Sequence, residues 1–294
     1  MTARPKDVGP MARQHLLIVA KRPAYDLLTG ADRRRLDEAG VVDDETLRAG
    51  REAHHATLQR IRRHLGAHRV TVAHTGEVGP MHVADCDLVI AVGGDGTALS
   101  VHQLLDGTPL LAVNSDPGRS VGHYTRCTAD SFDNLFDAWL QRRHRIEELP
   151  RLQCCCQGHS SLVLNDCLIS NPNPGAMSRY RLQVPDGDER QHSSGIWIST
   201  ATGSTGAIAS AGMDPVPPEE PALLYLVREP FEGRGPIRLR QGLQRPPAFL
   251  QVTAGLSGLA AFIDGHHDYQ NVPPGGTVRL TADPRPLRLV AAAD

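Results

Sequence analysis

The stretch DLVIAVGGDGTALS, residues 87–100, joins an apolar run to a glycine-rich turn and then to a helical pattern. Gly93, Gly94 and Gly96 allow the backbone to adopt positive φ and to approach a ligand closely. The free N–H groups at the start of the following helix form an anion site. Asp95 would repel a phosphate there unless it binds a metal or accepts a proton from a hydroxyl group. Such a carboxylate beside phosphate-binding amides suits a kinase, but a simple turn with Asp95 as the helix cap explains the same residues.

Outward from this turn, the first half of the chain alternates strands and helices. We expect strands at residues 15–20, 70–73, 87–92 and 110–113, and helices at residues 46–65, 97–105 and 129–143. The first helix has Asp43 or Asp44 as its N-cap and Gly66 at its end. Its apolar stripe consists of Leu47, Leu58, Ile61 and Leu65, and the last helix turns Phe132, Leu135, Phe136 and Leu140 inward. This alternation predicts a Rossmann-like α/β domain with a parallel sheet.

From about Arg145 the segments become short and β-like, and turn residues separate them. Strands are expected at residues 151–156, 160–170, 179–184, 195–200, 223–227, 248–253, 259–264 and 277–281. One helical interruption is expected just after Gly203, and a loop over residues 229–247. The chain therefore divides into an α/β domain, residues 1–145, and a β-rich domain, residues 146–279, built as a β-sandwich. The C-terminal tail, about residues 280–294, is expected to return to the first domain.

Charge and composition exclude some classes of partner. The 294 residues carry a net charge of −2 and contain no apolar run of membrane-spanning length, so neither nucleic acid nor a membrane is an expected partner. Among the 31 positively charged residues, only Lys6 and Lys21 are lysines. A phosphate-rich ligand must therefore be met by arginine, by backbone N–H groups or by a metal.

The six cysteines indicate a reducing compartment rather than a metal site. Cys154, Cys155 and Cys156 are adjacent and lack the C-x-x-C spacing of zinc ligands. In a strand, the outer two would face one side and Cys155 the other, so we expect buried apolar residues with free thiols, which fit the cytoplasm. The first fourteen residues lack the apolar region of a secretory signal, although a transit peptide stays an alternative.

Three later motifs make the resemblance of the GGDGT turn specific. GGDGT resembles the turn of NAD kinases, of diacylglycerol and sphingosine kinases and, as a variant, of phosphofructokinases. The Asn165-Asp166 pair, the run TATGST at residues 200–205 and the run FIDG at residues 262–265 resemble, in order, elements of the NAD kinase family. The resemblance spans residues 87–265 and implies the NAD kinase/diacylglycerol kinase-like fold, with the β-rich domain as the NAD-binding one.

The resemblance also implies roles for individual residues. Asp95 would be the catalytic carboxylate at the adenosine ribose 2′-hydroxyl of NAD or NADH, with ATP or another phosphate donor and Mg²⁺ as the divalent metal. No metal ligand is assigned to the protein, and a homodimer or homotetramer is implied. Phosphate and nucleotide binding would involve Gly94, Gly96, Thr97 and Asn114. NAD binding would involve Asn165, Asp166, Ser194, Thr202, Thr205, Gly206, Ser210 and Asp264.

Shorter motifs indicate a sub-branch, and two departures concern the substrate. The run VNSDP at residues 113–117, the Ser193-Ser194-Gly195 run and the Ala20-Lys21 pair resemble the mitochondrial-type and plant NADH-kinase-like branch. Most family members carry an acidic residue where Ser194 stands, and there it reaches NAD across a subunit contact. Ala207 replaces an aromatic residue, so Tyr124, Tyr180 or Trp197 would have to supply a stacking surface.

Several alternatives remain open from the sequence. Asn165-Asp166 could form a plain turn, although the apolar residues on both sides favour a polar pair inside a strand that has a function. His266, His267 and Asp268 are expected in a solvated turn rather than at a metal, and Arg119 on the surface rather than at a phosphate. A lipid kinase and a nucleotide sensor without turnover are the rival functions. The choices between NAD and NADH, and between ATP and polyphosphate, are undecided.

Overall fold

The computed structural model describes residues 13–233, 235–265 and 268–293, which fall into two compact units. The first unit contains the described residues up to Ala98, then Thr108–Arg145 and the residues from Val290. The second unit contains Leu99–Gly107 and Ile146–Leu289. The first unit is the expected α/β half and the second is an antiparallel β half.

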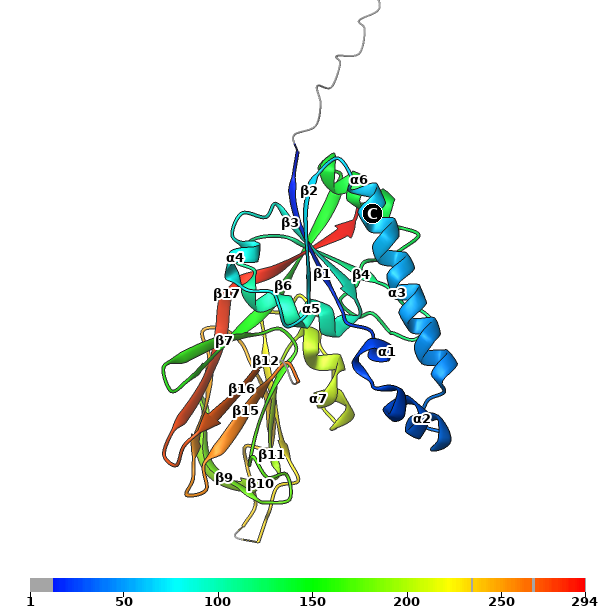
Figure 1. Cartoon of the computed structure of the whole chain (residues 1–294). Coiled ribbons are helices and arrows are strands. Elements are labelled where there is room, and N and C mark those ends of the chain that lie inside the picture. The colour runs from blue at the N-terminus through cyan, green and yellow to red at the C-terminus, as the bar shows by residue number, and fades with distance from the viewer. Residues whose placement is uncertain (1–12, 234, 266–267, 294) are drawn as a thin grey trace, which may run out of the picture. The chain divides into compact units, whose positions relative to one another are not determined.

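A parallel sheet forms the centre of the first unit (Figure 1). Its main strands are β1 (His15–Ala20), β2 (Arg69–His74), β3 (Leu88–Gly93) and β4 (Leu110–Asn114), in the order β4-β3-β1-β2. All neighbouring pairs are parallel, and the short β5 (Cys127–Thr128) pairs with β4. The residues of β3 and β4 are buried throughout, as in sheets that are covered on both faces. The carboxyl ends of β1, β3 and β4 therefore meet at one edge of this sheet.

The long helix α3 (Asp44–His64) matches the expected helix but buries a different face. Asp43 is its N-cap, and the Asp43 side chain accepts the backbone N–H of Thr46 at 2.6 Å. Within the helix, the fully buried side chains are His54, Thr57 and Ile61, whereas Leu47 and Leu58 are only partly buried. The expected stripe is therefore confirmed at Ile61 and Leu65 but wrong at Leu47 and Leu58, because buried hydrogen bonds allow two polar residues to face the interior. Thr57 donates to the Ala53 carbonyl at 2.9 Å, and His54 bonds to Ser115.

Other helices differ from expectation mainly at their ends. The helix after the glycine turn, α5 (Asp95–Val101), starts two residues early and continues as a 3₁₀ turn, His102–Leu104. The helix α6 (Phe132–Leu140) buries Phe132, Leu135 and Phe136 as predicted. Three short helices were not expected: α1 (Ala24–Leu27), α2 (Gly30–Glu38) and α4 (Pro80–Val83). In the described part of the chain, no helix has the length and apolar character needed to cross a membrane.

Two antiparallel sheets build the second unit. The first has the order β10-β9-β14-β17, and β6 pairs with both β17 and β7. Its strands are β6 (His144–Cys156), β7 (His159–Val163), β9 (Ser178–Val184), β10 (Gly187–Ser193), β14 (Phe249–Ala254) and β17 (Thr277–Ala292). The second sheet has the order β13-β12-β11-β8-β15-β16. Its strands are β8 (Asp166–Ser170), β11 (Gly195–Thr200), β12 (Leu223–Arg228), β13 (Gln241–Gln244), β15 (Leu259–Ile263) and β16 (Asp268–Val272).

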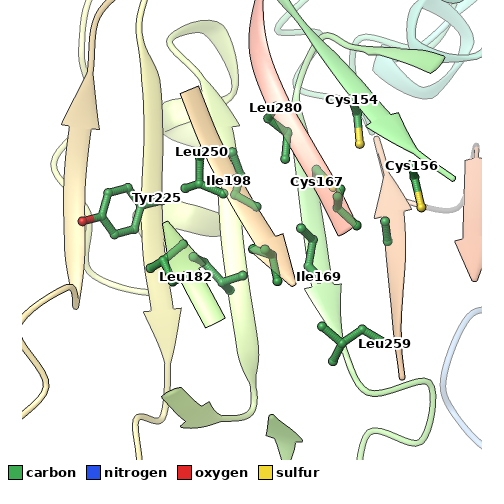
Figure 2. Close-up of a cluster of buried hydrophobic side chains, with 14 of the residues drawn as sticks. Cys154, Cys156, Cys167, Ile169, Leu182, Ile198, Tyr225, Leu250, Leu259 and Leu280 are labelled. Atoms are coloured by element: carbon green, nitrogen blue, oxygen red, sulfur yellow. The ribbon is translucent and has the colours of Figure 1, made fainter. Parts of the chain in front are cut away.

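One hydrophobic core joins the two sheets into the expected sandwich. Leu182 and Leu250 of the first sheet share a cluster with Ile169 and Ile198 of the second (Figure 2). The cysteine run behaves as predicted: Cys154 and Cys156 are buried in this core, whereas Cys155 is exposed. All six cysteines carry free thiols.

Several strands of the second unit differ from the prediction. The single strand expected at residues 160–170 is two strands, β7 and β8, which belong to different sheets and are separated by the corner Leu164-Asn165. The apolar residues on both sides of Asn165-Asp166 therefore did not indicate one continuous strand, because each side of the corner is a separate buried strand. The strand β13 lies inside the expected loop, and β10 and β16 were not expected. The 3₁₀ turn Thr202–Thr205 and α7 (Ala207–Ser210) form the predicted helical interruption. His266 and His267 lie outside the described residues.

Candidate active site

The glycine turn follows β3 at the edge where the parallel strands end. A Cβ atom at Gly93 would overlap the hydroxyl oxygen of Thr97, and one at Gly94 would lie 2.7 Å from the Ser120 hydroxyl oxygen. Neither glycine has a positive φ, and neither does Gly96. The expected left-handed backbone was therefore wrong for all three positions, and Gly93 and Gly94 are required because neighbouring side chains leave no room for a Cβ. Thr97 is buried, whereas Gly96 is exposed at the start of α5.

The Asp95 carboxylate is held by another loop rather than by its own helix. Oδ2 accepts the backbone N–H of His123 at 2.9 Å, and Oδ1 accepts the backbone N–H of Tyr124 at 2.7 Å. Asp95 is half-buried, so one side of the carboxylate stays accessible. Each oxygen still has a lone pair that can accept a further proton or hydrogen bond. The two N–H groups therefore orient the Asp95 carboxylate and leave a lone pair on each oxygen free to accept a proton or a hydrogen bond.

Asn114, expected at the pocket wall, shapes the loop after β4. Its Nδ2 donates to the Ser120 carbonyl at 3.1 Å, and its Oδ1 accepts the Asp116 N–H at 3.0 Å. The side chain is 4% exposed. Asn114 thus positions the Ser120 hydroxyl beside Gly94, which makes it a support of the glycine turn. Arg119 in the same loop is exposed, as expected, and forms an ion pair with Asp116 at 2.9 Å.

Two residues at this edge, Lys21 and His54, were given no site role from the sequence. Lys21 directly follows β1, and its Cβ lies 3.2 Å from the place of a Cβ at Gly93. Burial lowers the pKa of Lys21, the Asp116 carboxylate raises it, and Arg119 lowers it. His54 Nδ1 lies 3.0 Å from Ser115 Oγ, and burial, with a smaller contribution from the Lys21 charge, lowers the pKa of His54 to about 4. The sequence position of Lys21 could have indicated its role, because Lys21 follows the carboxyl end of β1, which pairs with β3.

In the second unit, the corner Leu164-Asn165 is fixed through its carbonyl groups. Thr200 Oγ1 donates to the Leu164 carbonyl at 2.6 Å, and Ser199 Oγ donates to the Asn165 carbonyl at 3.0 Å. A Cβ atom at Gly203 would overlap the same Asn165 carbonyl. The TATGST run, together with Ser199 before it, therefore supports the backbone of the Asn165-Asp166 pair.

The residues of the TATGST run and of the helix after it differ in burial. Thr202 and Ser204 are buried and bond to carbonyls of the following loop, at Pro218 and Val216 respectively. Thr205 and Ser210 are exposed. Gly206 lies beside the Asn165 amide, because a Cβ there would be 3.5 Å from Asn165 Nδ2. Thr205, Gly206 and Ser210 are thus open to a ligand, whereas Thr202 supports the fold.

Asp166 is a buried carboxyl group with an altered acidity. Its residue is 4% exposed, and its Oδ2 accepts the Asn165 Nδ2–H at 2.9 Å. Burial, reinforced by the charge of Asp264, raises the pKa of Asp166 to about 7. Its protonation state therefore changes within the physiological range.

A cavity of about 500 Å³ in the second unit brings Asp166 and Ser194 together. Trp197 and Phe262 add aromatic surface to its wall, and the Arg228 guanidinium lies 5.8 Å from the Trp197 ring centroid. Trp197 is the candidate stacking surface among the three that were expected. Tyr124 and Tyr180 are buried, at 2% and 4% exposure.

Within residues 13–233, 235–265 and 268–293, no three His, Cys, Asp or Glu side chains cluster so that they could hold a metal ion.

Comparisons with known proteins identify the family. Residues 33–144 match the family described as the ATP-NAD kinase N-terminal domain. A probable NADH kinase of Oryza sativa subsp. japonica is 32% identical over 246 residues, which cover 75% of each chain. The NADH kinase of Arabidopsis thaliana is also 32% identical, over 68% of this chain and 71% of its own length.

Solved structures show the same fold at low identity. An NAD kinase from Archaeoglobus fulgidus, determined in complex with ATP, has a TM-score of 0.64 at 20% identity over 95% of this chain and 94% of its own. Yeast NADH kinase, determined with NADH, has a TM-score of 0.71 at 16% identity over 96% of this chain and 84% of its own. The matches to the plant kinases and to the family domain favour the NAD kinase family over the lipid-kinase alternative. This chain belongs to the NAD kinase family.

Proposed function

We propose that the protein transfers the terminal phosphoryl group of ATP to the adenosine ribose 2′-hydroxyl of NADH, and less efficiently of NAD. The observation that carries this proposal is the oriented, half-buried Asp95 carboxylate beside the glycine turn of an NAD kinase family member. The plant relatives are named as NADH kinases, which supports NADH as the preferred acceptor.

Asp95 acts as the proton acceptor in this reaction. The 2′-hydroxyl oxygen attacks the γ-phosphorus in line, the bond from this phosphorus to the β–γ bridging oxygen breaks, and ADP leaves. The hydroxyl proton passes to a carboxylate oxygen of Asp95, whose orientation is set by the N–H groups of His123 and Tyr124. The reaction converts NADH to NADPH and ATP to ADP.

The phosphates of the donor are met by the edge of the first unit. Backbone N–H groups at the start of α5, together with Gly94, Gly96 and Thr97, form the anion site. Lys21, whose Cβ lies beside Gly93, adds a positive charge, although lysines are scarce in this chain. Magnesium enters as the MgATP substrate and offsets the charge of the phosphates.

Dinucleotide binding is assigned to the second unit, in line with the expectation for residues 146–279. Asn165 and Asp166 hydrogen-bond the adenosine part, with the exposed Thr205 and Ser210 and the half-buried Gly206 as further contacts. Trp197 supplies the stacking surface that Ala207 lacks. Supporting roles fall to Asn114, Thr202 and Asp264, because their polar side-chain groups are buried and engaged within the protein.

Location and assembly belong to the same proposal. The six free thiols suit the reducing cytoplasm. A homodimer or homotetramer is proposed because the residue that stands at the position of Ser194 in most family members reaches the dinucleotide across a subunit contact.

Replacing Asp95 by Asn removes the proton acceptor while keeping the size of the side chain. We expect kcat for NADPH formation from NADH and MgATP to fall about 10²–10⁴-fold, because a positioned base commonly contributes that much. NADH affinity by calorimetry should stay within about threefold, because the adenosine contacts lie elsewhere. Asp137→Asn on α6 is the matched control. Near-normal turnover in Asp95→Asn overturns the assignment, and wild-type protein that binds NADH without turnover with any donor indicates a sensor.

Replacing Lys21 by Met tests the phosphate role of this lysine. We expect the KM for MgATP to rise about tenfold at saturating NADH, because one charge-assisted contact contributes about 1.5–3 kcal/mol. Lys21→Arg keeps the charge and should recover most of the affinity. Steady-state kinetics with each substrate varied in turn provide the measurement, and an unchanged KM for MgATP in Lys21→Met contradicts the role.

The acidity of Asp166 predicts a pH dependence of NADH binding. An ionised carboxylate accepts hydrogen bonds from the adenosine donors, and the fraction ionised increases as the pH rises through about 7. We therefore expect NADH affinity to increase between pH 6 and pH 8, by up to about tenfold per pH unit below the pKa. Calorimetry across this range provides the test, and Asp166→Asn should flatten the profile. The same slope in both proteins would show that another group titrates.

Replacing Ser194 by Asp tests the preference for the reduced acceptor. The oxidised nicotinamide ring is a cation, and the uncharged Ser194 shares its cavity wall with the cationic Arg228. A carboxylate at residue 194 should shift the ratio of kcat/KM toward NAD about fivefold, since two charges 4 Å apart in water interact by about 1 kcal/mol. Ser194→Asn is the uncharged control. An equal change in both variants would refute the charge argument.

A further inference from the structure

Asp264 occupies an unusual backbone position at the end of β15. Its φ is +48°, in the left-handed region that non-glycine residues rarely adopt. The Asp264 N–H donates to the Asp166 carbonyl at 2.8 Å. The side chain has no exposed surface. A strained backbone and a fully buried carboxylate at one residue require strong local compensation.

The compensation comes from the backbone of the corner between β7 and β8. Asp264 Oδ1 accepts the N–H of Asn165 at 2.7 Å and that of Asp166 at 3.2 Å. The Leu164 N–H lies 3.2 Å from Oδ2 and 3.3 Å from Oδ1. Three successive N–H groups thus converge on one carboxylate, as in a backbone anion-binding nest. Their direction fixes the backbone from which the Asn165 and Asp166 side chains project.

His102 holds the carboxylate from the other side. Its Nε2 lies 2.6 Å from Asp264 Oδ2, and neither side chain is exposed. Among the residues that the structure describes, His102 Nδ1 has no hydrogen-bond partner, so the proton shared with Asp264 belongs on Nε2. The buried Arg151 fixes the His102 backbone, because its guanidinium donates to the His102 carbonyl at 2.8 Å and to the Leu105 carbonyl at 3.1 Å.

We infer that His102 and Asp264 form a buried positioning pair that aims Asn165 and Asp166 at the dinucleotide, and that neither member of the pair touches the substrate. The inference rests on the proposed function, in which Asn165 and Asp166 bind adenosine. It gives Asp264 a role different from the direct NAD contact expected from the sequence. The buried Asp264 carboxylate accepts hydrogen bonds from the backbone N–H groups of the corner and from His102, and no part of it is accessible to a ligand.

The test is a pair of substitutions at His102. His102→Leu removes the donor to Asp264, so the carboxylate shifts and the corner follows it. We expect the KM and the calorimetric Kd for NADH to rise about tenfold, while the KM for MgATP stays within about twofold. His102→Gln places an amide N–H near the former Nε2 and should restore NADH affinity to within about threefold of wild type. If His102→Leu is insoluble, His102→Asn replaces it, because its shorter amide cannot reach Asp264.

A control separates positioning from general loss of stability. Leu182→Ala removes packing in the same unit without removing a hydrogen bond to Asp264, and its unfolding temperature should fall while both KM values stay normal. Parallel changes in the two KM values of His102→Leu, or a His102→Gln variant as weak as His102→Leu, overturn the inference. Calorimetry keeps the two proposals apart: wild type that binds NADH without turnover contradicts the kinase but leaves the pair testable by Kd. Wild type that does not bind NADH overturns both.

Discussion

The convergence of three backbone N–H groups on the buried Asp264 carboxylate is the interaction on which the corner between β7 and β8 depends. Polar backbone groups at a buried corner must find partners, because each unsatisfied group costs about 1–3 kcal/mol. One carboxylate satisfies three N–H groups, and the hydroxyls of Ser199 and Thr200 satisfy the carbonyls. The corner can therefore be both buried and sharply bent, with Asp166 left to face a cavity.

The glycine turn of the first unit uses the same physical device. There the carboxylate is Asp95, the donors are the N–H groups of His123 and Tyr124, and the carboxylate remains half-buried rather than enclosed. This difference in exposure fits the proton-accepting role proposed for Asp95 and the positioning role inferred for Asp264. A carboxylate that must accept a proton needs an open side, whereas one that holds a backbone is most effective when water cannot compete for the same donors.

Much of the architecture followed from local pattern. The apolar run at residues 15–20 became β1 without change, and the alternation of the cysteine run correctly placed Cys155 outside. Prediction failed where tertiary contacts override pattern. The stripe of α3 includes His54, because Ser115 offers a buried partner, and Leu164-Asn165 is a turn between two buried strands, which apolar flanks cannot distinguish from one continuous strand.

The sequence by itself determined the class of the fold, the family and the identity of the chemical groups, because periodicity and short motifs are local properties of the chain. It named Asp95, Asn165 and Asp166, and it also named Asp264, but not what Asp264 contacts. Only the tertiary structure decided that Lys21 lies beside Gly93 and that His102 meets Asp264, 162 residues further along the chain. Contacts of that kind arise when distant strands and turns pack together, and no spacing within the sequence records them.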